Sequence, residues 1–167
     1  MFDSIPTAHR HAASYALAAA FDGEAVSQIR AVSGGASGAL IYRVEVAGRP
    51  YLLRLETRPG THGNPQRGYA AMRIAAEAGV APPLRHADAE AGVAIMDFVP
   101  QRPLADYPGG PSSLVRDLGG LIARLQTTPL FPPLMDYPVM LQAMLGIARS
   151  PGVTAPGLLD PHAEGFE

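Results

Sequence analysis

The sequence predicts an α+β fold, in which a five-stranded antiparallel sheet with a flanking helix is followed by helices of a second lobe. Two neighbouring runs, residues 39–47 and 51–56, alternate apolar and polar side chains, which is typical of half-buried strands. The short connection at residues 47–50 predicts that the two runs form an antiparallel hairpin. The predicted order is helix, three strands, helix, two strands, linker and helices. Because this order separates the strands from the last helices, it indicates an α+β protein.

The N-terminal part begins with a helix over residues 6–21, whose apolar residues recur at helical spacing and which Asp22 and Gly23 end. A short strand at residues 28–32 precedes the hairpin. In the first run of the hairpin, alternation places Leu40, Tyr42, Val44 and Val46 on one face and Ile41, Arg43 and Glu45 on the other. The second run repeats the pattern, with Tyr51, Leu53 and Leu55 opposite Leu52, Arg54 and Glu56.

After a loop at residues 57–64, Asn64 and Pro65 suit the cap and first position of a helix that ends at Gly79. Strands are expected at about 83–87 and at 93–99, and the proline-rich residues 100–111 form a linker. The clearest helix covers residues 112–127, with Ser112 and Ser113 as its cap and a continuous apolar stripe of Leu114, Val115, Leu118, Leu121, Ile122 and Leu125. A last helix at about 138–149 has Leu141, Met144, Leu145 and Ala148 inward, and the tail from residue 150 is irregular.

Composition excludes several function classes. The chain has 167 residues and a net charge of −2, so it lacks the basic surface of a nucleic-acid binder. All 13 basic residues are arginine, which excludes a Walker A loop and a lysine nucleophile or Schiff base. The absence of cysteine excludes thiolate metal sites and suits the cytoplasm. No segment has the length and apolarity of a membrane span, and the first residues do not resemble a signal peptide.

Three features along the chain suggest nucleotide chemistry, and each has a plainer alternative. The glycine-rich connection Ser33–Gly38 has the backbone freedom to approach a phosphate, or it is simply a turn between strands. Arg54 in the middle of its strand is either a cation for a phosphate or a half-exposed surface side chain. The apolar strand that runs into Pro100 offers backbone groups to a purine edge, or it is a core strand that leaves its sheet.

In this order the features resemble the N-terminal lobe of the kinase-like phosphotransferases, in the aminoglycoside phosphotransferase/choline kinase family. The resemblance covers about residues 15–130. It depends on the segments Ser33-Gly34-Gly35-Ala36-Ser37, Tyr51-Leu52-Leu53-Arg54-Leu55, Gly79-Val80-Ala81-Pro82-Pro83-Leu84, Met96-Asp97-Phe98-Val99-Pro100 and Gly119-Gly120-Leu121-Ile122-Ala123-Arg124-Leu125-Gln126. The arginine on the third strand is more similar to the choline kinase branch than to the aminoglycoside branch.

The resemblance implies ATP-dependent phosphoryl transfer to the hydroxyl of a small molecule, choline/ethanolamine-like or aminoglycoside-like. In that family's arrangement, Ser33, Gly34, Gly35, Ala36 and Ser37 cover the triphosphate, and Arg54 pairs with its α- and β-phosphates. The backbone of Asp97 and Val99 holds adenine, with Met96 at the back of the pocket. It further implies a nucleotide-binding small lobe at residues 1–99, a hinge or linker at 100–111 and an incomplete helical large lobe at 112–167.

Two departures from the family pattern limit the expected activity. The helix after the third strand carries Gly68 where the family has a glutamate for the basic residue. The family's catalytic Asp and its ligands for Mg²⁺ lie on a later His-x-Asp loop. The only match to that motif, His86-Ala87-Asp88, precedes the hinge and is expected to be a surface turn. We therefore expect no catalytic and no metal-binding residue in this chain, which would be an inactive fragment of a kinase that uses ATP and Mg²⁺.

Two other hypotheses stay open at this point. The chain could be a non-catalytic nucleotide-binding or interaction module with a kinase small-lobe fold. It could also be an unrelated α+β domain, which a structure without the five-stranded antiparallel sheet would indicate. The expected partners are a nucleotide and a small alcohol, with no nucleic acid and no membrane. Self-association is expected through the exposed apolar stripe of residues 112–127.

Overall fold

The computed structural model describes residues 2–33, 38–57, 65–133 and 137–150. The chain divides into two compact units, Met1–Pro132 and Pro133–Glu167. The first unit holds the whole sheet and three α-helices, and the second holds one α-helix.

The first unit is built on one antiparallel sheet of five strands in the order β1-β2-β3-β5-β4. The strands are β1 (Val26–Ala31), β2 (Leu40–Val46), β3 (Arg49–Leu55), β4 (Leu84–Asp88) and β5 (Val93–Asp97). Between β2 and β3, Ala47 and Gly48 both have positive φ, of 49° and 75°, as a two-residue hairpin turn requires. This sheet confirms the predicted fold class and hairpin.

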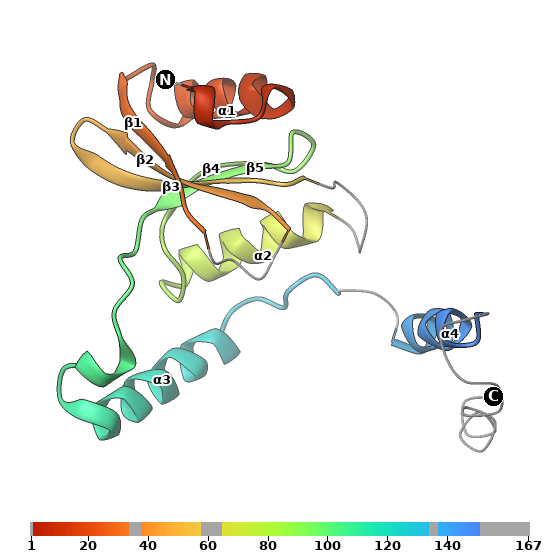
Figure 1. Cartoon of the computed structure of the whole chain (residues 1–167). Coiled ribbons are helices and arrows are strands. Elements are labelled where there is room, and N and C mark those ends of the chain that lie inside the picture. The colour runs from red at the N-terminus through yellow and green to blue at the C-terminus, as the bar shows by residue number, and fades with distance from the viewer. Residues whose placement is uncertain (1, 34–37, 58–64, 134–136, 151–167) are drawn as a thin grey trace. The chain divides into compact units, whose positions relative to one another are not determined.

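The two faces of the sheet carry different helices. Figure 1 shows α1 (Thr7–Ala20) on one face and α2 (Pro65–Glu77) on the other. The core lies under α1, where Ile5 and the small or apolar α1 residues pack against alternate strand residues. Its buried members are Ile5, Ala13, Ala16, Leu17, Tyr42, Val44, Val46, Leu53, Leu55, Val93 and Ile95. Since these strand residues are every second one in sequence, the alternation predicted for the hairpin is confirmed, and the opposite side chains face α2.

The segment after the sheet differs in detail from the sequence prediction. The expected linker contains a short 3-10 helix, η2 (Leu104–Asp106), and α3 (Gly110–Gln126) begins inside it. The N-cap is Gly109, with φ of 79°, so the prediction that Ser112 and Ser113 cap this helix is wrong. A helix accepts proline in its first turn, and Pro111 therefore lets α3 begin before the serines.

The apolar stripe of α3 is largely exposed in the part of the chain that the structure describes. Val115 is 69% exposed and Ile122 is 54% exposed, and Leu118 and Leu125 are also exposed. In the second unit, α4 (Tyr137–Ala148) leaves Met144 exposed, so the prediction that Met144 points inward is wrong, while Leu141 and Leu145 are half-buried. No helix among the described residues is long and apolar enough to cross a membrane.

Candidate functional site

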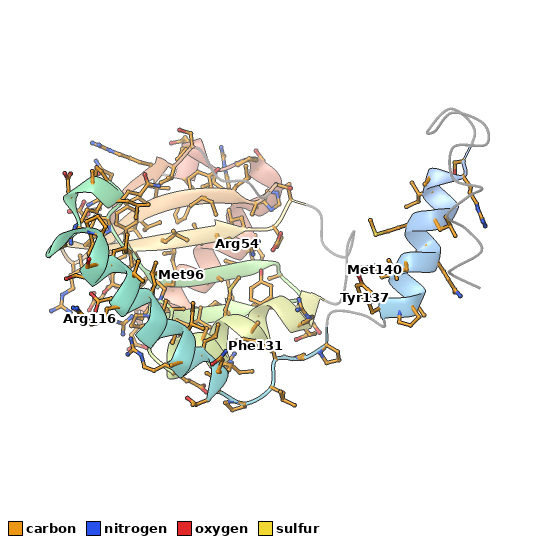
Figure 2. The ribbon with its side chains drawn as sticks, turned by 90° about the horizontal axis from the view of Figure 1, so that it is seen from below. Arg54, Met96, Arg116, Phe131, Tyr137 and Met140 are labelled. Atoms are coloured by element: carbon orange, nitrogen blue, oxygen red, sulfur yellow. The ribbon has the colours of Figure 1, made fainter. Side chains whose placement is uncertain are left out.

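The face of the sheet that α2 flanks carries the predicted site residues of β3 and β5. Leu52 lies between Arg43 and Met96 across three strands, and Arg54 lies in the next row, between Ile41 and Ala94. In Figure 2, which views this face, Arg54 and Met96 are labelled on the sheet. The arrangement sets an apolar surface, made by Leu52 and Met96, beside two arginines, Arg43 in the same row and Arg54 in the next.

Arg54 is paired with Glu56, which lies two residues further on, directly after the end of β3. The Arg54 Nη1 and Glu56 Oε1 atoms form an ion pair, and both side chains are less than one third exposed. Gly68, where the resemblance expects a glutamate, has no side chain to offer. The carboxylate thus comes from the residue directly after β3, and the sequence prediction missed it. The two-residue spacing, which places both side chains on one face of a strand, is the signal that could have found it.

Glu56 is held in place by its backbone and by a glycine. Its N–H donates to the Gly92 carbonyl at 2.8 Å. Gly92 has φ of 66°, and a Cβ on it would lie 3.1 Å from the Glu56 Cβ. Both the left-handed conformation and the close approach therefore favour glycine at this position.

Tyr69 is the buried side chain that α2 contributes beside this ion pair. The residue is 5% exposed, and its buried hydroxyl has no hydrogen-bond partner among the residues that the structure describes. Burial, followed by the negative charges of Glu56 and, more weakly, Asp88, raises the pKa of Tyr69 to about 12, while the positive charge of Arg54 acts in the opposite direction. Tyr69 is thus a buried neutral phenol within electrostatic reach of Arg54 and Glu56, and no sequence motif indicated it.

The end of β5 is flanked by two prolines. The Asp97 N–H donates to the Pro83 carbonyl at 3.0 Å, and the Phe98 N–H donates to the Pro50 carbonyl at 3.4 Å. In an antiparallel pair each residue normally receives the reciprocal bond, but proline has no N–H to donate. The carbonyls of Asp97 and Phe98 therefore lack that donor. This leaves two backbone acceptors beside Met96, where the resemblance places the edge of adenine.

Side chains around this segment are held by pairs of opposite charge. Arg85 donates to both carboxylate oxygens of Asp97, through Nε at 2.6 Å and Nη2 at 2.9 Å, and this pairing raises the pKa of Arg85. The Arg43 guanidinium lies 5.6 Å from the centre of the Phe98 ring.

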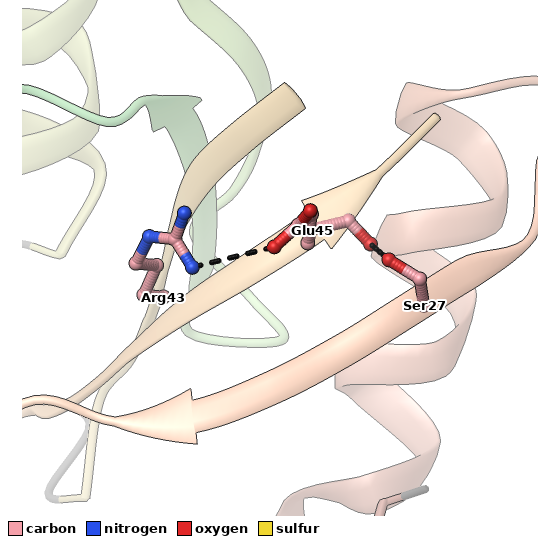
Figure 3. A network of polar contacts seen from close by, with 3 residues as sticks. All are labelled: Ser27, Arg43 and Glu45. Atoms are coloured by element: carbon pink, nitrogen blue, oxygen red, sulfur yellow. Dashed lines mark hydrogen bonds and ion pairs between the residues drawn. The ribbon is translucent and has the colours of Figure 1, made fainter. Parts of the chain in front are cut away.

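A third pair extends these contacts to the edge strand β1. Figure 3 shows that Arg43 Nη1 also donates to Glu45 Oε2 at 3.4 Å. In the same view the Ser27 hydroxyl donates to the Glu45 backbone carbonyl at 3.1 Å, from β1 to β2. The pair Arg43 and Glu45 has the same two-residue spacing on β2 as Arg54 and Glu56 have at the end of β3.

Other predicted site residues have different outcomes. Gly34, Gly35, Ala36 and Ser37 lie outside the described residues, and Ser33 is exposed just after β1. Val99 is exposed, and its N–H donates no backbone hydrogen bond among the described residues. Across the described ranges, no group of three His, Asp or Glu side chains could hold a metal ion.

The His86-Ala87-Asp88 motif does not form a surface turn as predicted, because all three residues belong to β4. Strand pairing with β5 outweighs the local turn signals of this short segment. Only the Asp88 side chain reaches the turn that follows, where Oδ1 accepts the N–H groups of Glu90 and Ala91 at 2.9 and 3.0 Å.

Comparisons with known proteins identify the family and a similar fold. The model of the phosphotransferase enzyme family matches residues 28–149. The fold is similar to the crystal structure of a choline/ethanolamine kinase family protein from Mesorhizobium loti, with a TM-score of 0.62 and 23% sequence identity over 94% of this chain. The chain spans about half, 51%, of the length of that protein. A search of the curated proteins finds no match. Because the family model covers most of the sequence, including every strand from β2 onward, the chain belongs to the phosphotransferase enzyme family.

Proposed function

We propose that this chain is the nucleotide-binding part of an ATP-dependent small-molecule kinase. The observation that carries the proposal is the face of the sheet beside α2, where Arg54 lies one row from the apolar surface of Leu52 and Met96. A phosphorylated purine has the matching chemistry, because its ring is flat and apolar and its phosphates are anionic. Membership of a phosphotransferase family supports phosphoryl transfer as the reaction class.

Each site residue would have a distinct role toward ATP. Leu52 and Met96 would contact the face of the purine, and the Asp97 carbonyl and the Val99 N–H would bind its edge. Arg54 would pair with the α- and β-phosphates as a planar, bidentate donor. Ser33 and the four residues after it would cover the triphosphate. Mg²⁺ neutralises phosphate charge in such reactions, and we assign no ligand for it among the described residues.

The acceptor in the full-length kinase would be the hydroxyl of a choline/ethanolamine-like or aminoglycoside-like molecule. The choline/ethanolamine kinase family protein with the similar fold supports the first of these. We expect this chain alone to bind Mg-ATP weakly and to transfer no phosphate. The absence of cysteine fits a cytoplasmic location.

The binding proposal is tested by titrating the chain with Mg-ATP and following backbone amide shifts by NMR. We expect saturable shifts at Leu52, Arg54 and Met96, with a dissociation constant weaker than low micromolar. Arg54→Met removes charge-assisted hydrogen bonds and should weaken binding by about tenfold or more. Arg49→Met, at an exposed arginine of the same strand, is the matched control. Equal effects of the two substitutions, or shifts confined to the α1 face, would contradict the proposal.

The exposed apolar stripe of α3 favours a second candidate, a non-catalytic nucleotide-binding or interaction module. The coding DNA distinguishes the two. An in-frame continuation that encodes His-x-Asp-x-x-x-x-Asn and a later Asp supports the kinase. A stop codon directly after Glu167, with no such motif downstream, supports the module.

A further inference from the structure

The hydroxyl of Tyr69 is a buried donor without an acceptor in the described part of the chain. Buried polar groups in native proteins nearly always have a partner, so an unpartnered one calls for an explanation. Tyr69 lies on α2 at 5% exposure, which leaves its hydroxyl little access to solvent. A neighbouring carboxylate that gives up its present partner would supply the missing acceptor.

Glu56 is the side chain that fits this requirement. It directly follows the end of β3, its side chain reaches back to pair with Arg54, and its backbone is fixed by the bond to Gly92. In the ligand-free chain its carboxylate is paired with Arg54. Its negative charge acts on the Tyr69 phenol, so the two groups are electrostatic neighbours.

A phosphate that binds Arg54 competes directly with Glu56. If the phosphate takes the guanidinium, a half-buried carboxylate loses its counter-ion, which is unfavourable unless a donor replaces it. The adjacent Gly68 has no side chain, and the Tyr69 hydroxyl is a buried donor with no hydrogen-bond partner among the described residues.

We propose that Glu56 changes its partner from Arg54 to Tyr69 and that this partner exchange positions Arg54 for phosphate. When a nucleotide phosphate takes the Arg54 guanidinium, the released Glu56 carboxylate accepts a hydrogen bond from the Tyr69 hydroxyl. Tyr69 is in this scheme a positioning residue, acting through Glu56. The inference rests on the proposed nucleotide site, and it adds a tyrosine and the glutamate after β3 in the place of the family's helix glutamate.

The first test measures Mg-ATP binding to Tyr69→Phe, with Tyr15→Phe as the matched control on α1, where Tyr15 is 63% exposed. We expect Tyr69→Phe to weaken binding by about tenfold to a hundredfold, the loss of one hydrogen bond to a charged group, and Tyr15→Phe to leave it unchanged. Tyr69→Phe should have no further effect in a Glu56→Gln background. The ligand-free chain should lose no stability, whereas a purely structural tyrosine would cost stability in both states.

The second test needs no nucleotide. Arg54→Met frees Glu56 directly, and Arg54→Gln serves if the methionine variant does not fold. Urea unfolding then measures the coupling between Tyr69→Phe and Glu56→Gln in a double-mutant cycle. With Arg54 present, we expect the effects of the two substitutions to be nearly additive. In the Arg54 variant, we expect them to be coupled by at least fivefold in the unfolding equilibrium constant.

The outcomes separate the two proposals. If Tyr69 and Glu56 are coupled in the Arg54 variant but the wild-type chain binds no ATP, the exchange is supported and the nucleotide site is overturned. ATP binding that depends on Arg54 but not on Tyr69 supports the site and overturns the exchange. An equal coupling with and without Arg54 also overturns the exchange.

Discussion

Substituting Leu52 and Leu53 separately tests the assignment of the two sheet faces. Leu53 is fully buried under α1 between Tyr42 and Ile95, while Leu52 is half-buried on the opposite face. Leu53→Ala removes three carbon groups at about 0.8 kcal/mol each, and the cavity left behind raises the loss to about 3–4 kcal/mol. Leu52→Ala leaves no closed cavity, so we expect a loss of about 1 kcal/mol.

Urea and thermal unfolding of both variants, followed by circular dichroism, measure this difference. A loss of 3–4 kcal/mol lowers the melting temperature by about 10 °C in a domain of this size. Leu52→Ala should instead weaken Mg-ATP binding by more than Leu53→Ala does, once both chains are folded. Equal losses of stability, or a larger one for Leu52→Ala, would refute the face assignment and with it the proposed site.

Three further predictions concern the polar groups and α3. Because the pKa of Tyr69 is raised in the folded chain, the neutral phenol stabilises the fold relative to the ionised phenol. This part of the free energy of unfolding is complete below pH 10 and is lost as pH rises from 10 toward about 12. Urea midpoints from pH 9 to 12 should fall less in Tyr69→Phe than in the wild type, and parallel declines would contradict this. Asp97→Ala breaks the exposed pair with Arg85 and should cost at most about 1 kcal/mol in urea unfolding; a loss above about 2 kcal/mol would show a stronger role. Ile122→Arg should reduce self-association in sedimentation experiments while Ala123→Arg, off the stripe, does not, and identical behaviour of the two would count against the stripe.

The sheet could be predicted from the sequence because its signal is local. Alternation at a period of two in the hairpin fixed which residues of β2 and β3 share a face, and Leu53 and Leu55 are buried as that pattern indicates. Arg54 could be placed for the same reason. The start of α3 could not, because several capping residues compete there. Gly109, with its left-handed conformation, begins the helix ahead of the two serines.

The partners of Arg54 depend on information that is not local. The resemblance directs attention to Gly68, whereas the carboxylate comes from Glu56, directly after the strand that carries Arg54. Tyr69 could not be found because its burial depends on how α2 packs against the sheet, and the spacing of residues along the chain does not encode that packing. The Asp97 and Phe98 carbonyls are a similar case, since only strand register shows that prolines lie opposite them.

The two prolines beside β5 also bear on the mechanics of the chain after the sheet. Pro50 and Pro83 each accept one hydrogen bond from this segment and can return none, so Asp97 and Phe98 are anchored by single bonds where an ordinary rung has two. At about 0.5–1.5 kcal/mol for each bond, releasing both costs about 1–3 kcal/mol. The backbone holds this corner weakly, so the contacts of Asp97 with Arg85 and of Phe98 with Arg43 supply the rest of the attachment of the chain beyond β5.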